Sequence, residues 1–150
     1  MNIYLDDVRT PKEEGWIVVR DYYQFVSKIQ ELGLENVKLI SLDHDLGDKA
    51  MREYFNNVSK NYKLDYDNLE GEKTGYDCCK WLINYFYDKY PKRIEMDRTS
   101  KKSIPIRFPK VVVHSANPIG SGNMIGYINN FLMNEGMTQD CVRVEIPHTV

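Results

Sequence analysis

Three short apolar runs of the chain end in clusters of polar residues. The runs span residues 2–5, 37–42 and 111–113, and the second is apolar on both faces, as is typical of a central strand in a parallel sheet. The clusters that follow are Asp6-Asp7, Asp43-His44-Asp45 and His114-Ser115-Ala116-Asn117. In an open α/β sheet, ligands bind outside the carboxyl ends of the strands. We therefore expect three distant segments to deliver polar groups to one crevice.

Helical periodicity fills the intervals between these runs. Helices are expected over 21–33, 74–90 and 118–132, and further strands at 16–19, at a sheet edge, and at 141–146. Strands that alternate with helices predict a doubly wound parallel sheet. The first crossover is reduced, because Thr10-Pro11-Lys12-Glu13 has the pattern of a capping box and Gly15 limits any helix there to about one turn.

Two polar segments interrupt this alternation. Residues 46–73 are polar, with a helix expected from Met51 to Val58, and we expect them to cover the crevice as a lid. Residues 92–109 are basic and irregular. At 150 residues, with no linker, the chain is expected to be one domain, 1–150, that carries insertions at about 46–73 and 92–109.

The composition narrows the functional classes. The chain is 42% hydrophobic and 28% charged with a net charge of -2, which indicates a globular protein rather than a basic platform for duplex DNA. No apolar run has membrane-span length, and the start of the chain reads as a strand rather than a secretory signal. Its three cysteines do not form a disulfide framework, and the adjacent Cys78 and Cys79 are expected to pack in a core helix. We expect a cytoplasmic location and make no prediction of oligomeric state.

The acids suggest a metal site. Asp6 and Asp7 are adjacent at a strand end, where they repel each other unless a cation or an arginine compensates them. Asp43 and Asp45 add two carboxylates, and hard oxygen ligands suit Mg²⁺ or Mn²⁺. The alternatives are that Asp7 caps a turn beside a solvated Asp6, and that the second cluster is a surface turn.

The histidines suggest proton transfer. His44 and His114 follow different strands, and two histidines on either side of a phosphate can act as a base and an acid. The alternative for His114 is a hydrogen-bonded structural role.

The turn at Asn117-Pro118-Ile119-Gly120-Ser121-Gly122 leads into a helix, whose first N–H groups can bind an anion. The alternative is a plain turn with a helix cap. Arg9 is suited either to fork onto a phosphate or to pair with a neighbouring acid.

The layout resembles the receiver domain of response regulators. In that domain an acidic pair follows the first strand, an aspartate ends the third and a hydroxyl residue ends the fourth, which matches Asp6, Asp7, Asp43 and Ser115. A receiver also has a lysine at the end of its fifth strand, and Ile146-Pro147-His148 offers none.

The chain is more similar to the cyclic-phosphate processing receiver domain, a family of phages and bacteria. The motifs that carry this resemblance lie between residue 2 and about residue 132. They are Leu5-Asp6-Asp7-Val8-Arg9-Thr10-Pro11, Ser41-Leu42-Asp43-His44-Asp45-Leu46-Gly47, Thr74-Gly75-Tyr76-Asp77 with Trp81-Leu82, and Val113-His114-Ser115-Ala116-Asn117-Pro118 with Gly120 and Met124.

The resemblance implies a receiver-like, flavodoxin-type five-stranded fold and a metal-assisted phosphoesterase. Its substrate would be a cyclic phosphate, either a 2′,3′-cyclic RNA end, as in RNA repair, or a cyclic nucleotide, in the host cytoplasm if the chain is phage-encoded. The predicted roles are metal binding by Asp6, Asp7, Asp43 and Asp45, catalysis by His44, His114 and Asp43, and substrate binding by Arg9, Ser115, Asn117 and Gly120.

Three other functions stay open at this point. One is a degenerate, non-catalytic receiver that binds a phosphorylated ligand or partner. Another is a receiver phosphorylated on Asp43, against which the missing lysine argues. A haloacid-dehalogenase-like phosphatase fits less well, because it needs two acids separated by one residue after the first strand, and position 8 is Val8.

Overall fold

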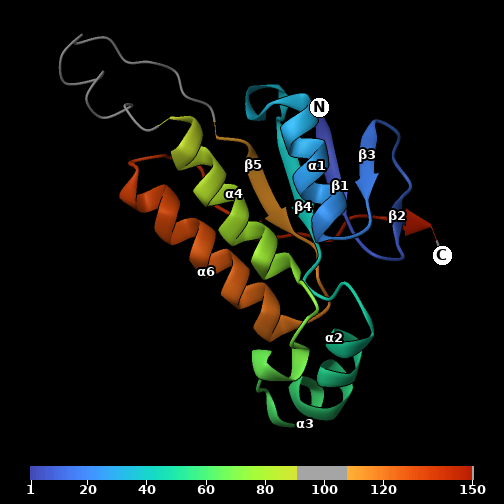
Figure 1. Cartoon of the computed structure of the whole chain (residues 1–150). Coiled ribbons are helices and arrows are strands. Elements are labelled where there is room, and N and C mark those ends of the chain that lie inside the picture. The colour runs from blue at the N-terminus through green and yellow to red at the C-terminus, as the bar shows by residue number, and fades with distance from the viewer. Residues whose placement is uncertain (91–107, 150) are drawn as a thin grey trace, which may run out of the picture.

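A parallel five-stranded sheet forms the centre of the protein (Figure 1). The computed structural model describes residues 1–90 and 108–149. The strands, in the spatial order β3-β1-β4-β5-β6, are β3 (Trp16–Val19), β1 (Asn2–Leu5), β4 (Leu39–Leu42), β5 (Lys110–Val113) and β6 (Val142–Arg143). This arrangement confirms the receiver-like fold and the edge position of 16–19, while the last strand is shorter than predicted because the chain leaves the sheet toward Pro147.

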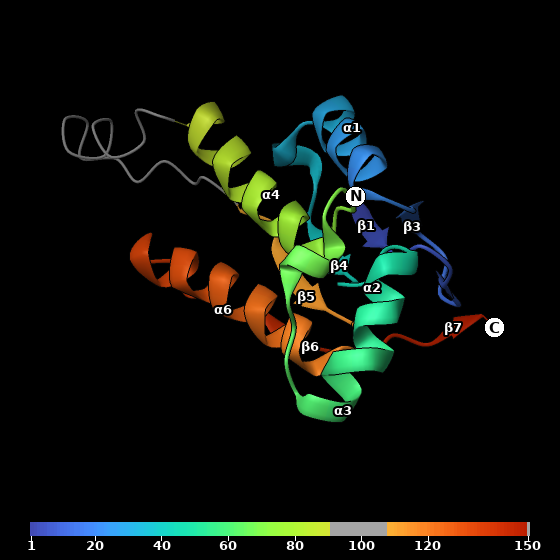
Figure 2. The ribbon, with the colours of Figure 1, turned by 60° about the horizontal axis from the view of Figure 1, so that its bottom comes forward.

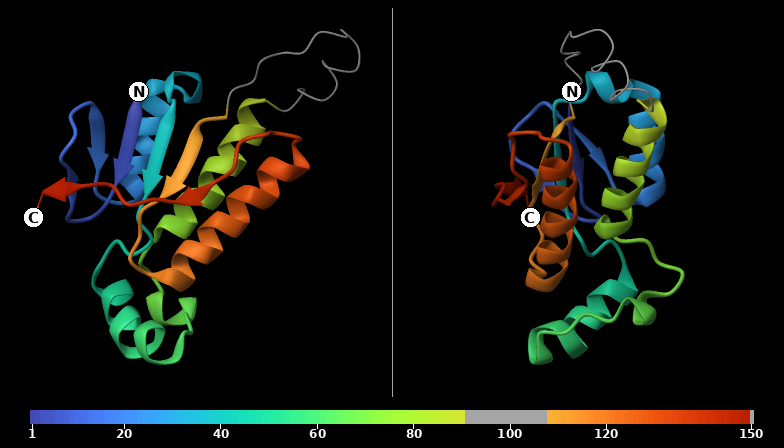
Figure 3. Two further views of the ribbon diagram at one scale, coloured as in Figure 1. Left: turned by 180° about the vertical axis from the view of Figure 1, so that it is seen from behind. Right: turned by 90° about the vertical axis from the view of Figure 1, so that its left-hand side faces the viewer.

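Three long helices lie side by side on one face of the sheet (Figure 3). They are α1 (Tyr22–Leu32), α4 (Gly75–Lys89) and α6 (Pro118–Asn134), and each begins at a side-chain cap, respectively Asp21, Thr74 and Asn117. A cap satisfies an amide that the first helical turn leaves without a partner. Their buried residues form one hydrophobic core with alternate residues of the strands, which include Ile3, Ile40 and Val111.

The first crossover contains no helix, so the predicted capping box at Thr10 is wrong. Thr10 and Pro11 form strand β2 (Thr10–Pro11), which pairs antiparallel with β7 (His148–Thr149). The physical reason is the distance that this connection must cover. Residues 6–15 must return along the length of the sheet, and an extended chain covers more than twice the distance per residue of a helix. The C-terminal segment crosses the strand ends to supply the partner strand, and Lys12 donates its amide to Pro147 at 2.9 Å.

The insertion at 46–73 lies beyond the carboxyl ends of the strands (Figure 2). It contains α2 (Asp48–Glu53), a π-helical turn η2 (Tyr54–Val58), α3 (Ser59–Asn61) and the 3₁₀ turn η3 (Tyr66–Leu69), which confirms the helix predicted over 51–58 and extends it. The carboxylate of Glu72 accepts from the amides of Lys49 (3.1 Å) and Ala50 (2.7 Å), so the end of the insertion holds its beginning.

The predicted basic insertion at 92–109 lies almost entirely outside the described residues. A further 3₁₀ turn, η1 (Leu34–Asn36), follows α1. Among the helices of the described ranges, none is both long enough and apolar enough to cross a membrane.

Candidate active site

The carboxyl ends of three neighbouring strands bring two acids and a histidine together. Asp6, Asp43 and His114 directly follow β1, β4 and β5, whose last residues are paired in register. All three residues are buried, and one ligand atom from each lies within 4.8 Å of the others. The convergence of three distant segments, expected from the apolar runs, is therefore present in the structure.

Asp6 is held as an anion by its surroundings. Its Oδ1 accepts from the amides of Val8 (3.0 Å) and Arg9 (2.7 Å), and its Oδ2 lies 2.7 Å from Arg9 Nε and 3.1 Å from His114 Nε2. Burial alone would raise the pKa of Asp6, but the hydrogen bonds from His114 and the two amides lower it to about 2. The carboxylate is fully engaged within the protein.

Asp43 has the opposite electrostatic character. It is 6% exposed, and its Oδ1 accepts from the amide of His44 at 2.8 Å. Burial first, and then the charge of Asp6, raise the pKa of Asp43 to about 7, despite opposing contributions from Arg9 and Ser115. Burial and Asp6 also raise the pKa of Asp7. The crevice therefore holds more negative charge than Arg9 neutralises.

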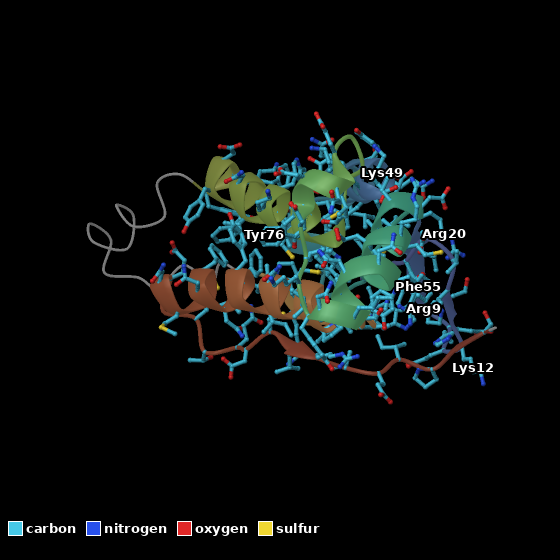
Figure 4. All side chains as sticks on the ribbon, turned by 90° about the horizontal axis from the view of Figure 1, so that it is seen from below. Arg9, Lys12, Arg20, Lys49, Phe55 and Tyr76 are labelled. Carbon is cyan, nitrogen blue, oxygen red and sulfur yellow. The ribbon has the colours of Figure 1, made fainter. Side chains whose placement is uncertain are left out.

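Arg9 pairs directly with two of these acids. It bonds Asp6 and lies 3.4 Å, through Nη2, from both Asp43 Oδ2 and the carbonyl of His114. Its own carbonyl accepts from Arg20 Nη1 at 2.6 Å, which anchors the loop after β1, and Figure 4 labels both arginines on the same side of the molecule. Of its two predicted roles, the structure shows pairing with acids.

His114 is enclosed by sheet residues. Its ring stacks on Tyr4 with centroids 4.3 Å apart, and its Nδ1 lies 2.6 Å from the hydroxyl of Ser41. Because a carboxylate only accepts hydrogen bonds, we assign the ring proton to Nε2, facing Asp6, and the acceptor role to Nδ1. Burial lowers the pKa of His114, although Asp6 raises it, so the ring is neutral at pH 7. The residue types are those of a Ser-His-Asp triad, but the two ring nitrogens are exchanged relative to one, and Ser41 is fully buried and cannot attack a substrate.

His44 belongs to a separate network. It has no exposed surface, its Nδ1 lies 2.6 Å from Asp45 Oδ1, and its Nε2 lies 3.0 Å from the hydroxyl of Tyr66 in the insertion. A Cβ at position 120 would collide with its ring, so Gly120 makes room for the histidine. The structure therefore does not bring His44 and His114 together on one partner.

The turn before α6 uses its polar groups internally. Asn117 Oδ1 accepts from the amide of Gly120 at 2.9 Å, and Asn117 Nδ2 donates to Asp45 at 3.1 Å. Ser115 Oγ accepts from the amide of Asn117 and interacts with Asp43. The N-cap alternative for this turn is thus seen, and substrate binding by Asn117 and Gly120 stays a prediction.

Two cavities open on either side of Arg9 and Ser115. The first, of about 230 Å³, lies between the strand ends and the insertion and is lined by Asp7, Asp43 and Asp45 together with apolar side chains. The second, of about 560 Å³, is lined by His114, Lys12, Arg143 and His148. Lys12, Arg143, His148 and Tyr66 were not among the predicted site residues. Ser41, the partner of His114 Nδ1, was also not predicted as a site residue. Its sequence signal was that it is a polar residue inside an apolar strand.

A receiver-like α/β fold with an acid-rich crevice at its strand ends defines the class of this protein. The comparison with known families identifies the family within this class. The model of the cyclic-phosphate processing receiver domain matches residues 1–130, and the chain belongs to that family. The family description links the domain to cyclic phosphates and hence to a phosphate-bearing ligand. No curated protein and no solved structure matches the chain significantly.

Proposed function

We propose that this protein is a metal-assisted phosphoesterase that opens a cyclic phosphate, either at a 2′,3′-cyclic RNA end or in a cyclic nucleotide. The observation that carries the proposal is the cluster of carboxylates at the strand ends, of which Asp6 and Asp43 are buried and Asp7 and Asp45 half-buried. Asp43, with a pKa raised to about 7, lines a cavity that also contains Asp7 and Asp45. Carboxylates gathered in this way are suited to bind a cation, and the bound cation could in turn hold a phosphate.

The residues fit a divalent cation of the Mg²⁺ or Mn²⁺ type. Asp7, Asp43 and Asp45 offer hard oxygen ligands to the cavity that they line, and Asp43 and Asp7 have raised pKa values that a cation would reverse. Asp6 would join them only by giving up part of its contact with Arg9 and His114. When bound, the cation would neutralise phosphate charge and acidify a water molecule.

Arg9 and Ser115 are suited to hold the phosphate, because both line the two cavities that meet at the crevice. In the reaction, water attacks phosphorus, one ester P–O bond of the ring breaks, and the proton lost by water ends on the departing oxygen. Of the predicted proton carriers, His114 lines a cavity, and Asp6 beside Nε2 would stabilise its protonated form. We assign proton transfer to His114, whose Nδ1 would have to release Ser41 to reach a substrate, and a positioning role to the enclosed His44.

The test is a screen of cyclic mono- and dinucleotides and of cyclic-ended RNA, with and without EDTA. Product formation that EDTA removes and Asp43→Asn abolishes is the expected result. Tight binding of a cyclic phosphate without turnover would instead favour the non-catalytic receiver, and a phosphorylated Asp43 after treatment with a phosphodonor would favour the phospho-acceptor receiver.

A further inference from the structure

We propose that the cavity between the acids and the insertion is a stacking subsite for a nucleobase, so that the substrate carries a base beside its cyclic phosphate. The inference rests on the proposed function and names its substrate class: nucleoside cyclic phosphates rather than base-free ones. Phe55 forms the stacking surface, and Met51 and Val8 flank it.

Three apolar side chains stand open to solvent around this cavity. Val8 is 75% exposed, Phe55 60% and Met51 52%, and all three line the space that the acids share. Single exposed apolar side chains are common on protein surfaces, but convergence of several on one cavity marks a binding site. They come from the loop after β1 and from the insertion, so two segments far apart in the sequence build the two walls.

The insertion presents Phe55 on a firm support. Phe55 lies on the π-helical turn, a geometry that is rare and frequent at functional sites. Its ring meets that of Tyr54 edge-on, with centroids 5.4 Å apart, and its carbonyl accepts from Ser59 Oγ at 3.0 Å. Upstream, Glu53 accepts from Asn68 at 2.8 Å, which ties α2 to η3. The aromatic surface is thus held in place before a ligand arrives.

The chemistry of the cavity changes over a short distance, and this identifies the occupant. One wall has Asp43, Arg9 and Ser115, and the other has Met51, Tyr54 and Phe55; Figure 4 labels Arg9 and Phe55. A ligand that satisfies both walls joins a phosphate to a flat ring whose face can stack on Phe55. The volume of about 230 Å³ lies below the range of about 300–1,000 Å³ that is common for drug-sized ligands. It therefore suits a single base rather than several stacked ones.

Binding of reaction products tests the subsite independently of turnover. We would measure the affinities of the four nucleoside 3′-monophosphates and of inorganic phosphate for the parent, Phe55→Ala and Phe55→Trp proteins, in the presence of Mg²⁺. Phe55→Ala should weaken nucleotide binding by roughly 5- to 100-fold for all four bases, since stacking needs only a π-face. Inorganic phosphate should bind equally well to both, and Phe55→Trp should retain nucleotide affinity.

Tyr62→Ala is the matched control, because Tyr62 is an aromatic residue of the same insertion, 73% exposed and outside the cavity lining. Equal nucleotide affinity in the Phe55→Ala and parent proteins, or an equal loss for inorganic phosphate, would overturn the subsite. If nucleotides bind through Phe55 and no cyclic phosphate is hydrolysed, the subsite stands and the phosphoesterase fails. If base-free cyclic phosphates are hydrolysed without Phe55-dependent nucleotide binding, the phosphoesterase stands and the subsite fails.

Discussion

His44 and His114 have nearly the same local surroundings and different places in the molecule. Each follows a buried strand, and each ring lies between one carboxylate and one hydroxyl: Asp45 and Tyr66 for His44, Asp6 and Ser41 for His114.

The partners of His114 all lie in or directly after the neighbouring strands β1 and β4, which pair in register with each other, as β4 does with β5. The partners of His44 include Tyr66 from the insertion, and Asp45 links it to the start of α6 through Asn117. The same residue type at the same kind of position thus serves the crevice in one case and attaches the insertion in the other. The elements that supply the partners, the sheet in one case and the insertion in the other, separate the two roles, whereas the local sequence does not.

The largest expected effect separates the two histidines by rate. His114→Gln should lose on the order of 10²–10⁴ in kcat for a cyclic phosphate, the usual scale for an acid–base group. His44→Gln should lose less in kcat and more in stability, because its ring is fully enclosed. Steady-state kinetics and thermal melts of both variants check this. Equal kcat losses in the two variants would contradict the division of roles.

Asp43 should make the stability of the metal-free protein depend on pH. Folded Asp43 keeps its proton up to about pH 7, whereas the unfolded chain loses it near pH 4, so the folded state is stabilised at low pH and loses that stability as pH rises from 4 to 7. The Asp43 contribution to the unfolding free energy should fall by roughly 2–4 kcal/mol over this range.

Urea denaturation of the parent and Asp43→Asn proteins in EDTA isolates that contribution, since the neutral asparagine has none and the titration of His114 is common to both. The difference in stability between the two proteins should shift in favour of Asp43→Asn as the pH rises. A difference that is constant from pH 4 to 7 would show that the carboxyl is not perturbed.

The space above His44 can be tested with two glycines of the same helix. Gly120→Ala places a methyl group against the His44 ring and should destabilise the protein by about 1–3 kcal/mol through overpacking. Gly122→Ala meets no atom within 4 Å and should be neutral or stabilising, because alanine favours the helix. Thermal melts measure both, and a Gly120→Ala protein as stable as Gly122→Ala would mean that the ring can move aside.

The smallest expected effect concerns the link between His44 and the insertion. Tyr66→Phe removes the hydroxyl that bonds His44 and accepts from Asn123 at 3.1 Å, and should cost about 0.5–1.5 kcal/mol. Amide hydrogen exchange should speed up in residues 46–73 more than in the strands. Unchanged exchange in the insertion would show that other contacts, such as those of Glu72, suffice to hold it.

Local signals in the sequence were enough to predict the main elements. The caps Asp21, Thr74 and Asn117 act within three residues of themselves, and all three begin the predicted helices. The apolar runs and the acids after them predicted the sheet and its crevice, because parallel strands end at the same edge. At Thr10-Pro11 the local signal gave way to pairing with His148 and Thr149, more than a hundred residues away.

By itself the sequence determined which residues stand at the strand ends, and hence that Asp6, Asp43 and His114 meet. Only the tertiary structure decided their partners: Arg9 neutralises Asp6, Tyr66 closes over His44, and Phe55 faces the acids. Strand periodicity is a property of neighbouring residues, whereas these contacts join segments whose separation along the chain follows no period. Their geometry arises only when the sheet, the helices and the insertion pack together.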